Sequence, residues 1–315
     1  MGAKMISTVV SVGLPVEEVL NIYKRTLTPL TLSGKEKRFC IVSGLYGDEL
    51  EGQFVCYELM RRINAKPECL KGIIDIYPAV NPLGMEAITR GIPTFDLDMN
   101  RSFPGNEDGD MVERIAAKVV EEIIGADMCL DLHASNIFIR EIPQVRLSDE
   151  NVAALSEYAK MLNVDFVWAY ESPTVLESTL VHTLNKLGVP TLAVEMGVGM
   201  RITQEYGMQL VDGILCLLNK IGIWDGETIT PKEPMVSTEG EVEYVHAEAS
   251  GIFLPAIEHW KGIKKGDTVG DIINSLTGKV EHHITAPCDG MVFSLREYPV
   301  VYEGSLIARI LGGAV

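Results

Sequence analysis

The sequence predicts an α/β fold, with a mixed, largely parallel sheet flanked by helices and followed by a small C-terminal β domain. Short β-rich runs alternate with longer helical patterns through residue 222, and such alternation is typical of parallel or mixed sheets. The strand candidates show little polar alternation, as expected where helices cover both faces of a sheet. Beyond residue 222 the alternation of strand and helix patterns stops, which predicts a second domain of a different kind.

The first part contains the runs that predict this sheet. Its expected strands fall at 38–44, 72–80, 128–134, 164–170 and 191–197. Its expected helices carry apolar residues at three- and four-residue spacing and fall at 51–65, 110–125, 148–163, 174–188 and 203–222. Ser148 is an expected N-cap, and Gly125 and Gly188 are expected C-caps.

The C-terminal part has a different pattern. Residues 224–244 are rich in Pro, Gly, Thr and Glu without an apolar period, which predicts a linker. Two segments that follow, 249–274 and 287–311, each contain a strand that begins with glycine (the Gly-led strand), a short connecting segment and a second apolar strand. This faint repeat predicts a small two-fold barrel or sandwich, similar in pattern to biotinyl and lipoyl domains. The expected domains are therefore 1–226 and 227–315.

Composition excludes several classes of partner. With 27 basic and 44 acidic residues the formal charge is −17, which repels nucleic acid and anionic lipid. The six cysteines are scattered and form no C-x-x-C, a pattern that predicts reduced thiols in a cytoplasmic protein. The start of the chain is a poor signal peptide, and no run has the length of a membrane span. The expected partner is a small anionic molecule, and homo-oligomerisation is left open.

Chemically capable side chains follow the predicted strands. Glu49 follows the first, the loop 96–105 (DLDMNRSFPG) follows the second, His133 ends the third and Glu195 ends the last. Ligands bind outside the carboxyl ends of strands in open α/β sheets, so these groups are expected at one edge. Each also has a simpler explanation: Glu49 as a helix-start carboxylate, His133 as a hydrogen-bonded strand end, Arg101 of the loop as a loop-anchoring salt bridge, and Glu195 as the partner of a buried base.

Taken together, GLYGDELEG, NPLGMEAITRGIPTFDLDMNRSFPG, DLHAS and TLAVEMG resemble the aspartoacylase/succinylglutamate desuccinylase family of the zinc carboxypeptidase superfamily. The similarity runs across most of the chain and implies a zinc-carboxypeptidase-like fold. It also implies a zinc ion held by Glu49 and His133, together with the residue at position 46, and Glu195 as general base.

The same resemblance implies a substrate site. Asn100 and Arg101 match the pair that binds a substrate carboxylate, and Arg90 matches the arginine that polarises the scissile carbonyl. A guanidinium offers a planar fork suited to a carboxylate, and the amide beside it adds neutral hydrogen bonds. This arrangement suits an N-acyl amino acid.

Tyr46 stands where the family has a histidine ligand. A phenol is a poor zinc donor until it ionises, and its pKa near 10 makes ionisation costly at neutral pH. Zinc could be held by Glu49 and His133 with Tyr46 or water as a weak third ligand, the metal and catalysis could both be lost, or a distorted site could act on an easier substrate.

We therefore expect zinc-dependent hydrolysis of an amide in a small carboxylate-bearing substrate, as in N-acyl amino acid deacylases. The alternative is a catalytically silent carboxylate-binding relative that has lost its metal. A biotinyl-like carrier is a third class, but Lys279 lacks the flanking residues of an attachment site and is expected to be an ordinary surface lysine.

Overall fold

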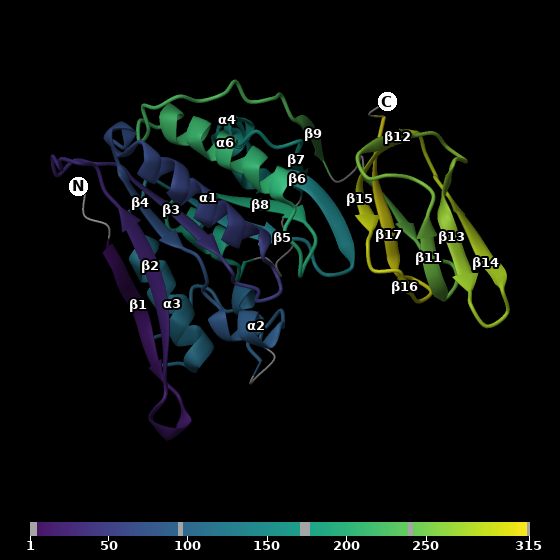
Figure 1. Ribbon diagram of the computed structural model, residues 1–315, viewed down its shortest axis with the longest axis horizontal. Helices are drawn as coiled ribbons and strands as arrows, with labels where there is room; N and C mark the ends of the chain where they lie inside the picture. The colour runs from purple at the N-terminus through teal and green to yellow at the C-terminus, as the bar shows by residue number, and fades with distance from the viewer. Residues whose placement is uncertain (1–4, 94–96, 171–176, 239–241, 314–315) are drawn as a thin grey trace.

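Four parallel strands form the centre of the α/β part of the large sheet (Figure 1). The computed structural model describes residues 5–93, 97–170, 177–238 and 242–313. The central strands lie in the order β4-β3-β5-β8 and are β3 (Arg38–Ser43), β4 (Ile73–Tyr77), β5 (Met128–Ala134) and β8 (Thr191–Gly197). They are four of the strands expected from the sequence, and the expected α/β class is confirmed.

Antiparallel strands extend this core on both sides, which makes the sheet mixed. On one side, β1 (Met5–Gly13) and β2 (Val19–Leu27) form a hairpin that joins β4 through β2. On the other side, β6 (Ile139–Ser148) runs antiparallel to β8. The fifth expected strand, β7 (Phe166–Tyr170), pairs in parallel with β6. The strands β1, β2 and β6 were not predicted, because their mixed polar and apolar residues lack the continuous apolar run that is typical of the central strands.

Helices cover both faces of the sheet. Those that were expected are α1 (Glu51–Ala65), α3 (Met111–Ile123), α4 (Asp149–Met161), α5 (Leu180–Lys186) and α6 (Gln204–Lys220). Buried residues of α1, α4 and α6 pack on one face, and those of α3 and α5 pack on the other. The fourth expected helix is shorter than predicted, because the Thr179 side chain accepts a hydrogen bond from the His182 backbone N–H and caps α5 there. Residues 174–176 of that prediction lie outside the described residues.

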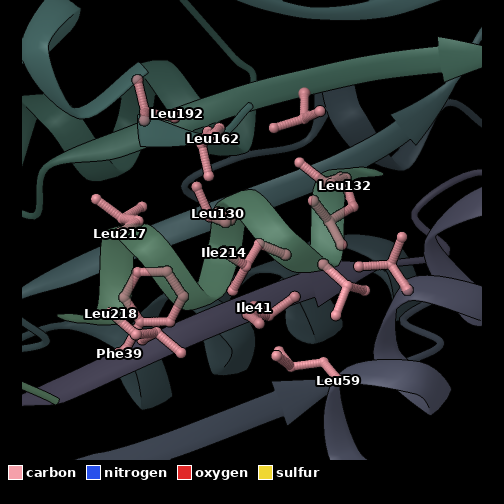
Figure 2. Packing of buried hydrophobic residues seen from close by; sticks show 14 of the residues in the cluster. Phe39, Ile41, Leu59, Leu130, Leu132, Leu162, Leu192, Ile214, Leu217 and Leu218 are labelled. Atoms are coloured by element: carbon pink, nitrogen blue, oxygen red, sulfur yellow. The ribbon is translucent and has the colours of Figure 1, made fainter. Parts of the chain in front are cut away.

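The larger core lies between α1, α6 and the central strands (Figure 2). Phe39 and Ile41 of β3 and Leu130 of β5 are fully buried against Ile214 and Leu218 of α6. At about 25 cal/mol per Å² of apolar surface removed from water, each such side chain stabilises the fold by about 1.5–3 kcal/mol. This rigid layer fixes where the strand ends, and so the candidate site, must lie.

The segment expected to be a linker contains strand structure, so that prediction was wrong in part. β9 (Met235–Thr238) pairs in parallel with β7, and β10 (Val242–His246) pairs with β17 (Leu306–Gly312). Strands this short leave no readable period in the sequence. Among the described residues, no helix is long and apolar enough to cross a membrane.

The C-terminal strands pair in a way that matches the faint repeat. β11 (Gly251–Pro255) pairs with β13 (Thr268–Asn274) and β16 (Val300–Val301), while β15 (Gly290–Arg296) pairs with β17 and β12 (Lys261–Ile263). Each Gly-led strand therefore pairs with the long strand of its own repeat and the short strand of the other. β14 (Lys279–Thr285) adds to β13, and β15 joins the large sheet by pairing with β6. The boundary at residue 226 stays a prediction.

Candidate active site

The carboxyl ends of β3, β5 and β8 bring the predicted site residues to one edge of the sheet. His133 and Glu195 are register partners on the parallel strands β5 and β8, so their side chains lie on the same face. Glu49 lies in the turn after β3, and its carboxylate reaches His133, with Oε2 3.0 Å from Nδ1. The structure therefore brings together three residues that are far apart in the sequence.

The turn before α1 is held in place by close backbone packing. The Gly47 N–H donates to the Arg90 carbonyl oxygen at 3.2 Å, and the Glu49 N–H donates to the Tyr46 carbonyl oxygen at 3.3 Å. A Cβ on Gly47 would lie 2.0 Å from the carbonyl carbon of Gly84, in the short helix α2 (Pro82–Ala87). Only glycine permits this approach, which places Arg90 beside the turn.

Both oxygens of the buried Glu49 carboxylate have partners. Oε1 accepts a hydrogen bond from Arg90 Nη1 at 2.8 Å, and Oε2 accepts one from the Ala134 backbone N–H at 3.0 Å, beside its contact with His133. On the far side of the imidazole, His133 Nε2 lies 3.0 Å from Asp131 Oδ2. Burial opposes a charge on His133, but the Asp131 and Glu49 carboxylates raise its pKa well above the usual value.

Tyr46 is buried beneath Arg90. The guanidinium carbon lies 3.3 Å from the centroid of the Tyr46 ring, and the phenol O–H donates to Asp98 Oδ2 at 3.3 Å. Burial raises the pKa of the phenol, although the charge of Arg90 opposes this shift. The side chain therefore remains neutral and is already engaged on its face and at its oxygen.

The predicted carboxylate-binding pair lies on a short turn of 3₁₀ helix, Met99–Arg101. The Asp98 side chain caps this turn by accepting from the Asn100 backbone N–H at 2.9 Å. Asn100 Oδ1 accepts from the Leu180 backbone N–H at 2.9 Å, and Arg101 Nη1 donates to the Asn100 carbonyl oxygen at 2.8 Å. Within the described part of the chain, no carboxylate pairs with Arg101, so its guanidinium is available to an incoming anion.

Glu195 is held by an arginine that the sequence analysis missed. Arg146 Nη1 lies 3.2 Å from Glu195 Oε1. Burial raises the pKa of Glu195 to about 7, although the charge of Arg146 opposes this shift. Arg146 lies on β6, which was not predicted as a strand, so nothing in the sequence pattern indicated that Arg146 lies near the site.

These residues surround one cavity of about 190 Å³. Six of the seven predicted site residues line it, and Glu49 lies directly behind His133 and Arg90. The lining residues that carry the chemistry are Tyr46, Arg90, Asn100, Arg101, His133 and Glu195. The volume suits a small molecule, and the three arginines of the wall, which include Arg146, favour an anionic one.

The donors do not fit the three-ligand zinc centre that the resemblance implies. Zinc in hydrolytic sites takes three protein donors and one water. Glu49 Oε1 already accepts a hydrogen bond from Arg90, and the third candidate, Tyr46, is a neutral phenol bonded to Asp98. In the described residues, no group of three or more His, Cys, Asp or Glu side chains could hold a metal ion.

An α/β sheet with parallel central strands and a polar cavity at their carboxyl ends has the arrangement in which α/β enzymes bind their ligands. Residues 35–221 match the model of the succinylglutamate desuccinylase/aspartoacylase catalytic domain, and the chain belongs to this family.

Similar proteins agree with this assignment. The chain is 28% identical over 312 residues to the N-alpha-acetyl-L-2,4-diaminobutyric acid deacetylase of Halomonas elongata, covering 94% of this chain and 89% of that one. A succinylglutamate desuccinylase/aspartoacylase structure from Rhodobacter sphaeroides has a TM-score of 0.80 at 22% identity, covering 98% and 95%. The product-bound ectoine utilization protein EutE (DoeB) from Ruegeria pomeroyi has a TM-score of 0.81 at 21% identity, covering 98% and 93%.

Proposed function

We propose that this chain hydrolyses the amide bond of a small N-acyl amino acid that it holds by its carboxylate. The observation that carries the proposal is Glu195, a carboxyl with a pKa of about 7 on the wall of a cavity that also presents the open guanidinium of Arg101. A group with this pKa can both take up and return a proton near neutral pH. The named deacetylase and desuccinylase relatives support the same reaction class.

The roles follow from the chemistry of each side chain. Arg101 and the Asn100 amide bind the substrate carboxylate and fix the orientation of the acyl group. Arg90, whose side chain lines the cavity, polarises the scissile carbonyl by offering a cation to the oxygen on which negative charge develops. Glu195 takes a proton from the attacking water and returns it to the leaving amine. Zinc is the cofactor that the family resemblance implies, but no step is assigned to it because the donor set does not fit.

A second candidate is supported by a separate observation. Arg90 is engaged with Glu49 at 2.8 Å, and a guanidinium held there is less free to move toward a substrate carbonyl. The chain would then be a catalytically silent protein that binds carboxylates through Asn100 and Arg101. A small-molecule partner is common to both candidates, while a cytoplasmic location and a homo-oligomer stay predictions from the sequence.

A substrate panel tests the proposal. N-acetyl and N-succinyl amino acids are incubated with the protein, and released amine is identified by mass spectrometry, with C-terminal amides of the same compounds as matched controls. We expect cleavage of the free acids and little cleavage of the amides, which lack the α-carboxylate of the amino acid. Calorimetric binding without cleavage would favour the silent candidate, and neither binding nor cleavage of any compound would contradict both.

A further inference from the structure

We infer that the guanidinium of Arg90 replaces a metal cation at this site, so that the cavity is complete without zinc. The inference deepens the proposed function and rests on it only for the identity of the substrate. Three features of the described residues carry it: the pairing of Glu49, the support beneath Arg90 and the contacts of the Tyr46 hydroxyl.

The first feature is the charge balance around Glu49. A carboxylate that is 3% exposed needs a cation or several donors, because an unpaired buried charge costs a large free energy. Arg90 supplies that cation at 2.8 Å, and the Ala134 N–H supplies a further donor at 3.0 Å. The imidazole of His133 lies 3.0 Å from the other oxygen of Glu49. In a zinc site the metal would supply the positive charge that Arg90 supplies here, so Glu49 is fully paired without a metal ion.

The second feature is the platform that holds Arg90. The guanidinium lies over the Tyr46 ring, with 3.3 Å between the guanidinium carbon and the ring centroid. A phenol ring binds a cation through its π face. The Arg90 backbone is fixed as well, since its carbonyl oxygen accepts from Gly47 N at 3.2 Å and Asn81 Nδ2 at 3.4 Å. The tyrosine at position 46 therefore supports the Arg90 guanidinium and does not provide a metal donor.

The third feature gives the Tyr46 hydroxyl a role other than coordination. It donates to Asp98 Oδ2, while Asp98 Oδ1 accepts the Asn100 backbone N–H. Tyr46 thus connects the turn after β3 to the turn that carries Asn100 and Arg101. A phenol that ligated zinc would have to leave this contact and lose its proton.

Metal content and thermal stability test the inference on the full-length protein. The wild type, Tyr46→Phe, Tyr46→His, Arg90→Lys and Arg90→Gln are dialysed against zinc, desalted and analysed for bound zinc by mass spectrometry. We expect wild type and Tyr46→Phe to retain less than about 0.1 zinc per chain, and Tyr46→His to bind zinc at least about tenfold more tightly, since imidazole is a regular zinc donor. Chelator should leave the melting temperature of the wild type unchanged.

The two Arg90 variants test whether the guanidinium takes the place of a metal cation. Arg90→Gln should melt at a lower temperature than Arg90→Lys, because of the two only lysine keeps the positive charge that position 90 places beside Glu49. Equal melting temperatures would overturn the role of Arg90. About one zinc per wild-type chain that is lost in Tyr46→Phe would overturn the inference altogether, and a Tyr46→His protein that gains no zinc would show that position 46 is not the missing donor. None of these results depends on turnover, so a failed amine-release assay would count against the proposed reaction alone.

Discussion

Arg146 lies 3.2 Å from Glu195, and the same guanidinium donates to Glu141 at 2.7 Å. Glu141 is 1% exposed and also accepts from Arg309 of β17. The predicted base is therefore linked, through Arg146 and Glu141 of β6, to a strand of the C-terminal part of the chain. This ion network makes β17 a support for the candidate site.

Removing Arg309 should destabilise the fold. Arg309→Met leaves Glu141 buried with one cation fewer, and losing a partner of a buried charged group costs about 1–3 kcal/mol. Denaturant unfolding measures this loss, with Lys66→Met as the control. Lys66 pairs with Glu227 in solvent, with side chains 48% and 91% exposed, so its removal should change stability by less than about 1 kcal/mol. Equal losses of stability in both variants would show that the buried Arg309–Glu141 pair contributes no more than the exposed Lys66–Glu227 pair.

Hydrolysis should depend on the ionisation of Glu195. Burial raises its pKa to about 7 and the carboxylate is the form that accepts a proton, so kcat/KM should fall as pH drops below about 7 and level off above it. Glu195→Gln should lower kcat by a factor on the order of 10²–10⁴ while substrate still binds. The exposed Glu205 of α6 supplies the control, Glu205→Gln. A Glu195→Gln protein with a wild-type rate would remove this residue from the mechanism.

The central strands of the sheet were predicted from the sequence, whereas the antiparallel strands beside them were not. The central strands are buried on both faces, so their apolar runs follow directly from their position in the sheet. Glu49 was predicted from its place after a strand and by family resemblance, and Arg90 by resemblance alone. Their mutual pairing depends on the approach of Gly47 to α2, which no local pattern reports. Arg146 was missed for a related reason, since its role exists only because β6 lies beside β8.

Arg101→Lys should weaken carboxylate binding although the charge is kept. A lysine ammonium cannot reproduce the two parallel hydrogen bonds of a guanidinium, and the loss of one charge-assisted hydrogen bond of about 1.5–3 kcal/mol corresponds to an increase in Kd of roughly 10- to 150-fold. Titration calorimetry with an N-acyl amino acid measures this change. Normal affinity in Arg101→Lys would place the carboxylate elsewhere in the cavity.

Gly47→Ala should damage both stability and the site. Its Cβ would meet backbone atoms of α2 at 2.0 Å, and overpacking of this kind costs about 1–3 kcal/mol. Gly13→Ala is the matched control, since a Cβ there meets nothing within 4 Å. We expect Gly47→Ala to unfold at lower denaturant concentration and to bind substrate more weakly, whereas Gly13→Ala behaves like the wild type. Equal stability of the two variants would mean that the turn moves away without cost.

Release of amine from N-acyl amino acids by chelator-treated protein tests the central claim most directly. We expect that the wild type, shown by elemental analysis to contain no zinc, cleaves a carboxylate-bearing substrate, and that Glu195→Gln binds the same compound without cleaving it. Activity that disappears with chelation and returns with zinc would contradict a site that works through Arg90 and Glu195 alone. Binding without cleavage in the untreated wild type would contradict the proposed hydrolysis.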